Sequence, residues 1–286
     1  MWIVLAILTA LSEALKDVFS KISLRTSDPI MLSFAMRMYA LPFLLPLLLF
    51  IEIPEIGEYF IPALIIGGTM NVFITIIYMK AIQHSDLGVT VPMVTFTPLF
   101  LLITSPLIVG EFPELAGVLG VIAIVVGSYF LQFNARKKGL LAPFKALLTD
   151  KGPRLMLLVA FLWSITANID KVGIINSSPI FWVVSVSSFL FVGMIPVVLI
   201  FARKTLNKAS VFNKGFFLIG LLTAATLVFQ MTAIQMTLVA YVISIKRTSA
   251  LMVVIFGALF FKETGFKNRL IGVIIMLIGV MLITLV

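Results

Sequence analysis

Gly120-Val-Ile-Ala-Ile-Val-Val-Gly127 recurs in this chain as Gly272-Val-Ile-Ile-Met-Leu-Ile-Gly279. Met79-Lys-Ala-Ile-Gln83 recurs in the same way as Met231-Thr-Ala-Ile-Gln235. Both recurrences have one offset, 152 residues (272 − 120 and 231 − 79), so whole segments and not isolated residues are repeated. Self-similarity at a fixed offset indicates an architecture built from repeated units. The chain therefore consists of two related halves.

The composition is that of a membrane protein. Hydrophobic residues make up 61%, charged residues 12%, and the mean hydropathy is +1.19, whereas charged residues are about a quarter of a soluble domain. A membrane span takes roughly 20 residues, so 286 residues leave no room for a soluble catalytic domain. With no Cys and one His, we expect no enzyme activity, no metal site and no cofactor.

Apolar runs bounded by charged or turn residues predict ten membrane-spanning helices, five in each half. They cover residues 2–22, 29–50, 59–80, 88–109, 115–133, 155–175, 179–201, 215–236, 239–261 and 269–286. An odd number of spans per half places the second half upside down relative to the first, as in many transporters. We therefore predict an all-α integral membrane fold with two inverted five-helix repeats, residues 1–133 and 154–286, joined by a basic linker, residues 134–153.

The net charge of +9 reflects membrane topology, and we expect no nucleic-acid partner. The loops after the first, third, fifth, seventh and ninth spans hold most of the basic residues: Lys21, Arg25, Lys80, Arg136, Lys137, Lys138, Lys145, Lys151, Arg154, Arg203, Lys204, Lys208, Lys214, Lys262, Lys267 and Arg269. The opposite face is acidic, with Glu52, Glu55, Glu58, Glu111 and Glu114. The positive-inside rule predicts cytoplasmic basic loops and two exterior termini in the inner (plasma) membrane.

Several motifs resemble a known family. Tyr78-Met-Lys-Ala-Ile82, Thr97-Pro-Leu-Phe100 and Gly110-Glu111, with their counterparts in the second half such as Leu259-Phe-Phe-Lys-Glu263, are similar to the signature of the drug/metabolite transporter superfamily, EamA type. The resemblance implies ten helices in two inverted repeats and alternating access for a small metabolite. Lys246-Arg247 also resembles the Lys-Arg pair with which plastid phosphate translocators and nucleotide-sugar transporters hold a phosphate.

Charged residues within the spans are candidate functional groups, because a charge at membrane depth is costly and needs a partner or a wet cavity. They are Glu13, Lys16, Asp17, Arg37, Asp170, Lys171, Lys246 and Arg247. Adjacent helical residues project about 100° apart, so we expect one of Lys246 and Arg247 to face a cavity and the other to pair with a carboxylate, for which Glu13 is the candidate. The alternative is a closed ion pair that locks two helices. Lys16 has the spacing for a local pair with Glu13.

Uncharged polar residues in the spans form a second group of candidates, each equally suited to bonding helices together. We assign Asn71, Thr95, Asn168 and Gln230 to the substrate site with Lys246, Arg247, Glu13 and Arg37. Thr95 is the repeat equivalent of Arg247 (247 − 95 is 152), so the site is predicted to be asymmetric. Pro92, Pro98 and Pro106 are expected to kink the fourth span, whereas the ninth has no proline and is expected to be straighter.

The leading functional hypothesis is a secondary transporter that moves an anionic or zwitterionic metabolite, possibly phosphorylated, through a central cavity by alternating access. One alternative is a proton-coupled exporter of amino acids or drugs with Glu13 as the proton carrier. A second is a lipid-handling or non-transporting membrane protein. The expected partners are a small-molecule substrate, membrane lipids and possibly a coupling proton or counter-substrate, for a protein that acts as a monomer or homodimer.

Overall fold

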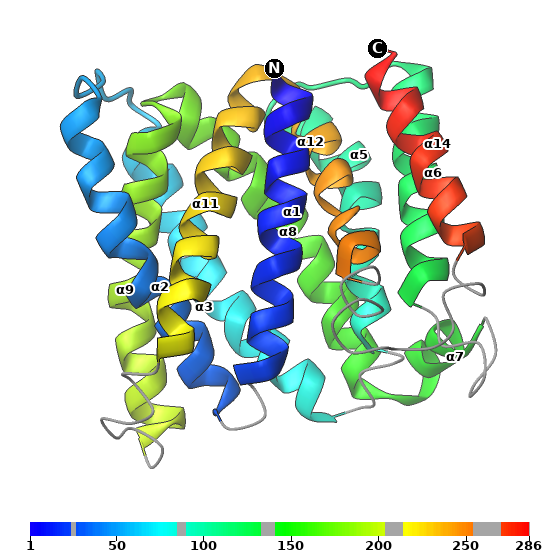
Figure 1. Cartoon of the computed structure of the whole chain (residues 1–286), viewed down its shortest axis with the longest axis horizontal. Coiled ribbons are helices and arrows are strands. Elements are labelled where there is room, and N and C mark those ends of the chain that lie inside the picture. Colours follow the sequence, from blue (N-terminus) through cyan, green and yellow to red (C-terminus); the bar gives the residue numbers. More distant parts are fainter. Residues whose placement is uncertain (24–26, 85–89, 133–140, 204–213, 254–269, 286) are drawn as a thin grey trace. The chain divides into compact units, whose positions relative to one another are not determined.

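The computed structural model describes residues 1–23, 27–84, 90–132, 141–203, 214–253 and 270–285, and every regular element in these segments is helical. The elements, which Figure 1 shows, are α1 (Trp2–Ser23), α2 (Pro29–Leu44), η1 (Leu45–Phe50), α3 (Phe60–His84), η2 (Val91–Phe96), α5 (Thr97–Ile108), α6 (Leu115–Gln132), α7 (Ala142–Thr149), α8 (Lys151–Ile175), α9 (Pro179–Phe201), α11 (Lys214–Met236), α12 (Val239–Lys246) and α14 (Leu270–Thr284). The predicted all-α class is confirmed.

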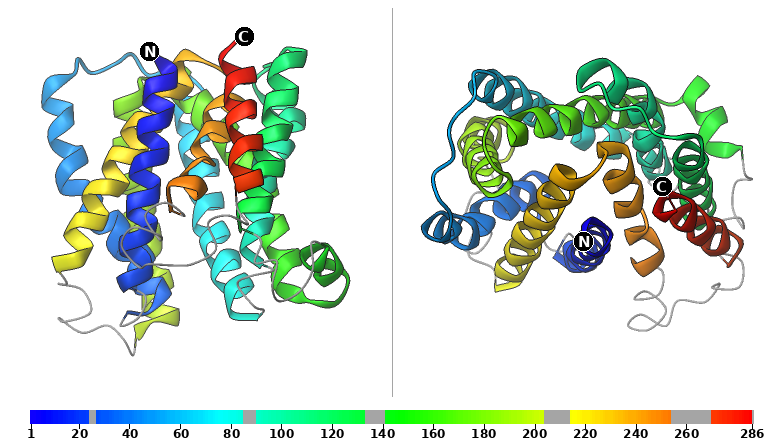
Figure 2. Two further views of the ribbon diagram at one scale, coloured as in Figure 1. Left: turned by 45° about the vertical axis from the view of Figure 1, so that its right-hand side comes forward. Right: turned by 90° about the horizontal axis from the view of Figure 1, so that it is seen from above.

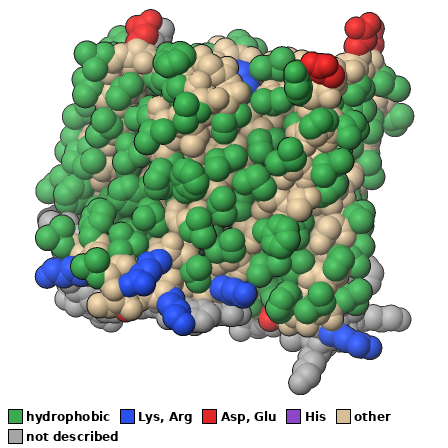
Figure 3. Space-filling view, turned by 180° about the vertical axis from the view of Figure 1, so that it is seen from behind, with side chains coloured by type: hydrophobic (Ala, Val, Ile, Leu, Met, Phe, Trp, Pro, Cys, Tyr) green, Lys and Arg blue, Asp and Glu red, His purple; other side chains and the backbone are tan. Residues whose placement is uncertain are grey.

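Several helices have the length and composition of membrane spans. Among the described residues, five apolar stretches are long enough to cross a bilayer: Pro29–Phe50, Phe60–Ala81, Lys151–Ile175, Pro179–Phe201 and Gly215–Met236. Shorter apolar helices cover Pro92–Ile108, Leu115–Leu131 and Ile271–Thr284. Hydrophobic side chains cover the visible sides of the helices in Figure 3. Such a surface suits contact with lipid.

The chain forms two compact units, and each takes residues from both sequence halves. The first unit contains residues 1–73 and 169–236, and the second contains residues 74–168 and 237–286. Helices α3 and α8 contribute residues to both units. The compact units are thus different from the two sequence repeats, because helices of one repeat pack mainly on helices of the other.

In the first unit, α1 packs along α11 (Figure 2), which also packs on α2 and α9. Helix α2 packs on α9, and the two run in opposite directions, because Met31 near the start of α2 clusters with Val198 and Ala202 at the end of α9. The rings of Phe34 and Phe191 stack between the same two helices with centroids 5.4 Å apart. These helices occupy corresponding positions in the two sequence halves.

The starts of α2 and α9 are capped alike. Asp28 accepts hydrogen bonds from the backbone N–H groups of Ile30 (2.8 Å) and Met31 (3.2 Å). Ser178 accepts a hydrogen bond from the backbone N–H of Phe181 (3.4 Å). In both cases a proline follows the capping residue, where its missing N–H is harmless and its fixed φ favours the helix. The repeated Asp/Ser-Pro pattern therefore defines the same helix start twice.

In the second unit, the repeated glycines form the contact between α6 and α14. A Cβ atom on Gly120 would lie 2.7 Å from the carbonyl oxygen of Gly279, and one on Gly279 would lie 2.7 Å from the carbonyl oxygen of Gly120. Gly127 and Gly272 face each other in the same way, at 2.6 and 2.7 Å. Only hydrogen fits in place of a side chain at these four positions. The helices are antiparallel and the contacts are reciprocal.

The fourth and ninth predicted spans are both interrupted, at repeat-equivalent positions. Val91–Phe96 is a 3₁₀ helix that continues as α5. In the ninth span, α12 ends at Lys246, and i to i+3 bonds from the N–H of Thr248 to Ile245 and from the N–H of Ala250 to Arg247 mark a turn. The ninth span, which was predicted to be straighter, is thus also interrupted although it has no proline. At the repeat offset of 152 residues, this turn is equivalent in sequence to the end of η2.

Contacts between loops agree with the predicted alternation of sides. In the first unit, the N–H of Gly57, before α3, donates to the carbonyl of Asn176, before α9 (2.9 Å). In the second unit, the N–H of Val239, at the start of α12, donates to the carboxylate of Glu111, before α6 (2.8 Å). Each contact joins two loops that the basic-residue pattern assigns to one face of the membrane. Which face is cytoplasmic stays a prediction.

The predicted linker, residues 134–153, contains the short helix α7. The ring of Phe144 packs against Phe96 at a centroid distance of 5.7 Å and against Tyr129 at 5.5 Å. These contacts fix α7 to η2 and α6 within the second unit. The linker is therefore partly an ordered element docked on the helices.

Candidate functional site

The eight residues assigned to the substrate site divide equally between the two compact units. The first unit holds Glu13, Arg37, Asn71 and Gln230, and the second holds Thr95, Asn168, Lys246 and Arg247. The structure brings residues together within each unit. The proposed pairing of Glu13 with Lys246 or Arg247 joins different units and stays a prediction.

Arg247 lies at the interruption of the ninth span and contacts the interruption of the fourth. It follows the last residue of α12, and its Nη2 donates a hydrogen bond to Oγ1 of Thr97, the first residue of α5, at 3.0 Å. Thr97 is buried, with 1% of its surface exposed. Since Lys246 occupies the last turn of α12, both cations lie where the helix dipole favours positive charge. The site is cationic and anchored to a buried hydroxyl.

Thr97, one of the polar candidates of the fourth predicted span, was not assigned to the substrate site, whereas Thr95 was. The hydroxyl of Thr95 is buried and donates to the carbonyl of Pro92 at 2.7 Å, which completes the 3₁₀ turn. Thr97 also donates to its own chain, to the carbonyl of Val94 at 2.8 Å, and its oxygen accepts the bond from Arg247. The sequence feature that could have pointed to Thr97 is the motif Thr97-Pro98-Leu99-Phe100. Its position at a helix start distinguishes Thr97 from Thr95.

Asn168 lies on α8 and links it to α5. Its Nδ2 donates to Oγ1 of Thr104 (3.0 Å) and to the carbonyl of Ser164 (2.8 Å). The side chain is fully buried, and among the described residues its Oδ1 has no hydrogen-bond partner. Asn168 therefore bonds two helices together and presents one further acceptor.

The charged residues of the first unit form a network centred on α1. Nζ of Lys16 lies 2.7 Å from Glu13 and 3.9 Å from Asp17, which confirms the local i to i+3 pair. The guanidinium of Arg37 on α2 interacts electrostatically with Glu13 and with Asp170 on α8. Charges of opposite sign on α1, α2 and α8 thus lie near one another. Such pairing lowers the cost of burying each ion.

Asp170 and its neighbour Lys171 each bind a buried group. The indole Nε1 of Trp182 donates to Asp170 at 2.9 Å, and the ring of Trp182, which is fully buried, packs over Gly173. Nζ of Lys171 donates to the carbonyl of Ile234 in the last turn of α11. A cation at a helix C-terminus satisfies a terminal carbonyl and complements the helix dipole. Lys171 thereby serves as a helix cap.

The two remaining candidates are polar residues of the first unit. Asn71 donates through Nδ2 to the carbonyl of Gly67, one turn earlier in α3, at 3.0 Å. Gln230 is buried on α11 with 6% of its surface exposed. Their assignment to substrate stays a prediction. Among the described residues, no cluster of three or more His, Asp or Glu could hold a metal ion.

Comparison with known proteins identifies the family. The sequence profile of the EamA-like transporter family matches residues 1–133 and 150–285. The chain belongs to the EamA-like transporter family. This EamA-like protein is therefore a multi-pass membrane transporter of small molecules, a class of carriers and not of enzymes, with membrane lipids around its apolar helices. The match falls in two segments, one in each sequence half.

The fold of this EamA-like transporter is also found among solved structures. One, titled "Crystal structure of protein", superimposes with a TM-score of 0.76 over 99% of this chain and 96% of that chain. The two sequences are 13% identical, so the likeness concerns the fold alone. The search of curated proteins found no match to this sequence.

Proposed function

We propose that this transporter moves a small anionic or zwitterionic metabolite, possibly phosphorylated, by alternating access through a central cavity lined by both halves. The observation that best supports this proposal is the hydrogen bond between Arg247 and Thr97, which joins two interrupted spans. Interrupted helices in corresponding positions of two halves are the usual location of a transporter's binding site, because they leave helix ends and backbone groups to contact the solute. Lys246 and Arg247 make this location positive.

The inverted arrangement of the two repeats, residues 1–133 and 154–286 with residues 134–153 between them, is supported by the contacts of α6 with α14. In a two-fold arrangement, if one position contacts a second, the equivalent of the second contacts the equivalent of the first. Gly120 against Gly279 and Gly127 against Gly272 follow this rule, because Gly272 and Gly279 are the equivalents of Gly120 and Gly127. Antiparallel equivalents require an axis in the membrane plane.

The substrate class follows from the asymmetry between the halves. Arg247 in the second half corresponds to Thr95 in the first, so the positive charge of one half has no basic counterpart at that position. A guanidinium binds phosphate or carboxylate with two parallel hydrogen bonds. The hydrogen bond to Thr97 orients the Arg247 guanidinium before substrate arrives. An anionic group of the solute would bind there, with Lys246 adding charge.

Uptake into liposomes tests this proposal. Liposomes that contain purified wild type, Arg247→Ala or Thr97→Val are supplied with a panel of phosphorylated, carboxylate, neutral and cationic solutes, and the uptake of each solute is measured. Losing a charge-assisted hydrogen bond costs about 1.5–3 kcal/mol, so Arg247→Ala should raise KM for the anionic substrate about ten- to hundredfold, and Thr97→Val less. Arg203→Ala, an exposed residue at the end of α9, is the matched control. Unchanged anion uptake by Arg247→Ala refutes the anionic site.

A second candidate function, a proton-coupled exporter, is favoured by the network of Glu13, Lys16 and Arg37. In this function Glu13 carries the proton. When its carboxylate is protonated, the ion pair between Glu13 and Lys16 breaks. Transport should then depend on a pH gradient and select cationic or neutral solutes. Glu13→Gln should abolish pH-driven accumulation while leaving exchange of solute intact, and Glu52→Gln, an exposed loop residue, should change neither.

We also propose the orientation given by the basic loops, with both termini exterior and the protein in the inner (plasma) membrane. The chain has no Cys, so single cysteines can be introduced without further changes. Glu52→Cys should react with a membrane-impermeant maleimide on intact cells, and Arg203→Cys should react only after permeabilisation. The opposite labelling pattern would reverse the assignment. Cross-linking in membranes would separate a monomer from a homodimer.

A further inference from the structure

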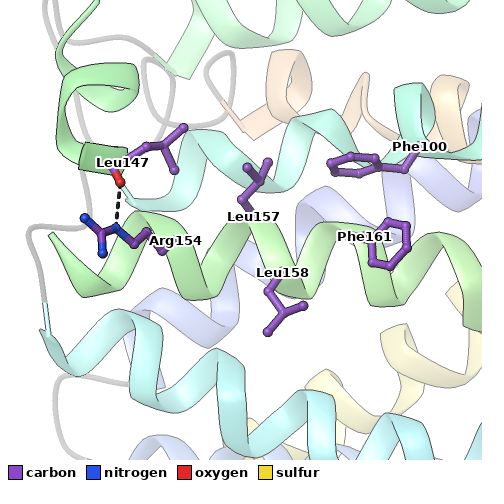
Figure 4. A pocket seen from close by; sticks show the side chains of 6 residues that line it. All are labelled: Phe100, Leu147, Arg154, Leu157, Leu158 and Phe161. Atoms are coloured by element: carbon purple, nitrogen blue, oxygen red, sulfur yellow. Dashed lines mark hydrogen bonds between the residues drawn. The ribbon is translucent and has the colours of Figure 1, made fainter. Parts of the chain in front are cut away.

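An apolar groove lies beside α7 and the first turns of α8, in the second unit. Its volume is about 420 Å³, and it is lined by Phe100, Leu147, Arg154, Leu157, Leu158 and Phe161. Figure 4 shows the four α8 side chains in succession along that helix, with Leu157 and Leu158 extending to opposite sides of it, Leu147 of α7 near Arg154 and Phe100 of α5 near Phe161. The rings of Phe100 and Phe161 meet edge to face at 5.5 Å. The groove is thus apolar along its length, with its one charged residue at one end.

Arg154 is held at that end by α7. Its Nε donates to the carbonyl of Leu147 at 2.6 Å, and its Nη2 donates to the carbonyl of Leu148. These carbonyls belong to the last turn of α7, so the guanidinium caps this helix. A guanidinium has five N–H donors, and these two bonds use two of them. Arg154 is exposed and fixed in place.

Other features give this end of the groove the character of a membrane interface. Lys151, also exposed, precedes Arg154 by one turn of α8, and residues three apart are neighbours on a helix surface. Leu148 of α7 is 79% exposed although it is apolar, which is typical of a short helix lying at the boundary between headgroups and acyl chains. From Arg154 to Phe161 the groove follows α8 for about 10 Å, starting at the basic end of a membrane-spanning helix.

We propose that this groove binds one acyl chain of an anionic phospholipid, with the lipid phosphate at Arg154 and Lys151. The apolar lining suits a hydrocarbon chain, and the capped guanidinium can hold phosphate oxygens without losing its bonds to α7. Basic pockets at the membrane surface bind anionic headgroups in this way. The site is independent of the transported solute, because none of its lining residues belongs to the Arg247 and Thr97 pair.

Lipid retention by the purified full-length protein tests the proposal. The protein is reconstituted in nanodiscs of phosphatidylcholine mixed with phosphatidylglycerol, extracted in mild detergent, and its bound lipids are counted by native mass spectrometry. Wild type should retain phosphatidylglycerol over phosphatidylcholine. Arg154→Gln should lower this preference about fivefold, the effect of about one basic group near an anionic lipid. Arg203→Gln, another exposed arginine at a helix end, is the control and should retain the preference.

A second variant covers the loss of the α7 cap in Arg154→Gln. Leu158→Trp fills the groove from an exposed position and leaves both bonds of Arg154 in place. It should displace the lipid to the same extent. Inorganic phosphate added alone should produce no thermal shift if the acyl chain is needed, whereas a shift with phosphate and none with lipid would overturn the proposal in favour of a free-phosphate site. The proposal is also overturned if both variants retain phosphatidylglycerol as wild type does, or if wild type retains phosphatidylglycerol and phosphatidylcholine equally.

Discussion

Replacing Gly120 by Ala tests whether the close approach of α6 and α14 stabilises this fold. The new Cβ would lie 2.7 Å from the carbonyl oxygen of Gly279 and 2.7 Å from Cγ1 of Ile283. Ordinary contacts begin at 3.4 Å, so α14 must retreat by about 0.7 Å. Overpacking of this kind costs about 1–3 kcal/mol, and Ala recovers up to about 1 kcal/mol of helix propensity.

The expected result is a net loss of about 1 kcal/mol in the free energy of unfolding. Titration with SDS in mixed micelles measures this quantity, with tryptophan fluorescence as the signal. The control is Gly193→Ala, where the obstacle is one side-chain methyl group, Cγ2 of Val72, at 2.9 Å, and not a backbone atom. This control should cost less than Gly120→Ala. If Gly120→Ala is as stable as Gly193→Ala, the close backbone contact does not determine the packing.

A double-mutant cycle sharpens the test. Once Gly120→Ala has separated the helices, the facing substitution Gly279→Ala should cost less than it does alone, because residues in contact couple. Gly120→Ala and Gly193→Ala belong to different compact units and should be additive within about 0.5 kcal/mol. Full additivity of the facing pair would contradict the reciprocal contact.

Three further substitutions address contacts in which one group is removed. Trp182→Phe deprives the carboxylate of Asp170 of its 2.9 Å donor and should lower the free energy of unfolding in the SDS titration by about 1.5–3 kcal/mol; no change would mean that the bond is dispensable. Glu111→Ala removes the cap on the Val239 N–H, so hydrogen exchange at the start of α12 should accelerate by an amount corresponding to about 0.5–2 kcal/mol, while exchange in α6 stays constant. Asp28→Ala should destabilise α2 by about 1 kcal/mol, and recovery with Asp28→Ser would separate capping from charge.

The sequence predicted helices best where apolar runs end at a strong signal. The starts of α2 and α9 coincide with Pro29 and Pro179 as predicted, because a capping side chain followed by proline can begin a helix and cannot continue one. Helix α7 was missed. Its eight residues are too few for a membrane span, and its order comes from the contact of Phe144 with distant rings, which local composition does not reveal.

The candidate site was predicted only in part, for reasons that depend on backbone geometry. The Glu13 and Lys16 pair follows from helical spacing alone and is confirmed. The choice between Thr95 and Thr97 depends on a 3₁₀ segment that shifts the two hydroxyls relative to a regular helix. The turn at Arg247 occurs without proline or glycine, so composition carried no sign of it. Proline content is therefore an unreliable guide to interrupted spans.

The reciprocal contact between α6 and α14 also constrains how this protein can change over generations. A larger side chain at Gly120 collides with the backbone at Gly279, and one at Gly127 collides with the backbone at Gly272, so neither copy of the motif can drift while the other is preserved. Arg247 and Thr95 are equivalent positions that take no part in the contact between α6 and α14, so this contact does not restrict substitutions at either of them. The helix contact is therefore expected to stay the same in both sequence halves, whereas the side chains at the Arg247 and Thr95 positions can change independently and alter which substrate is bound.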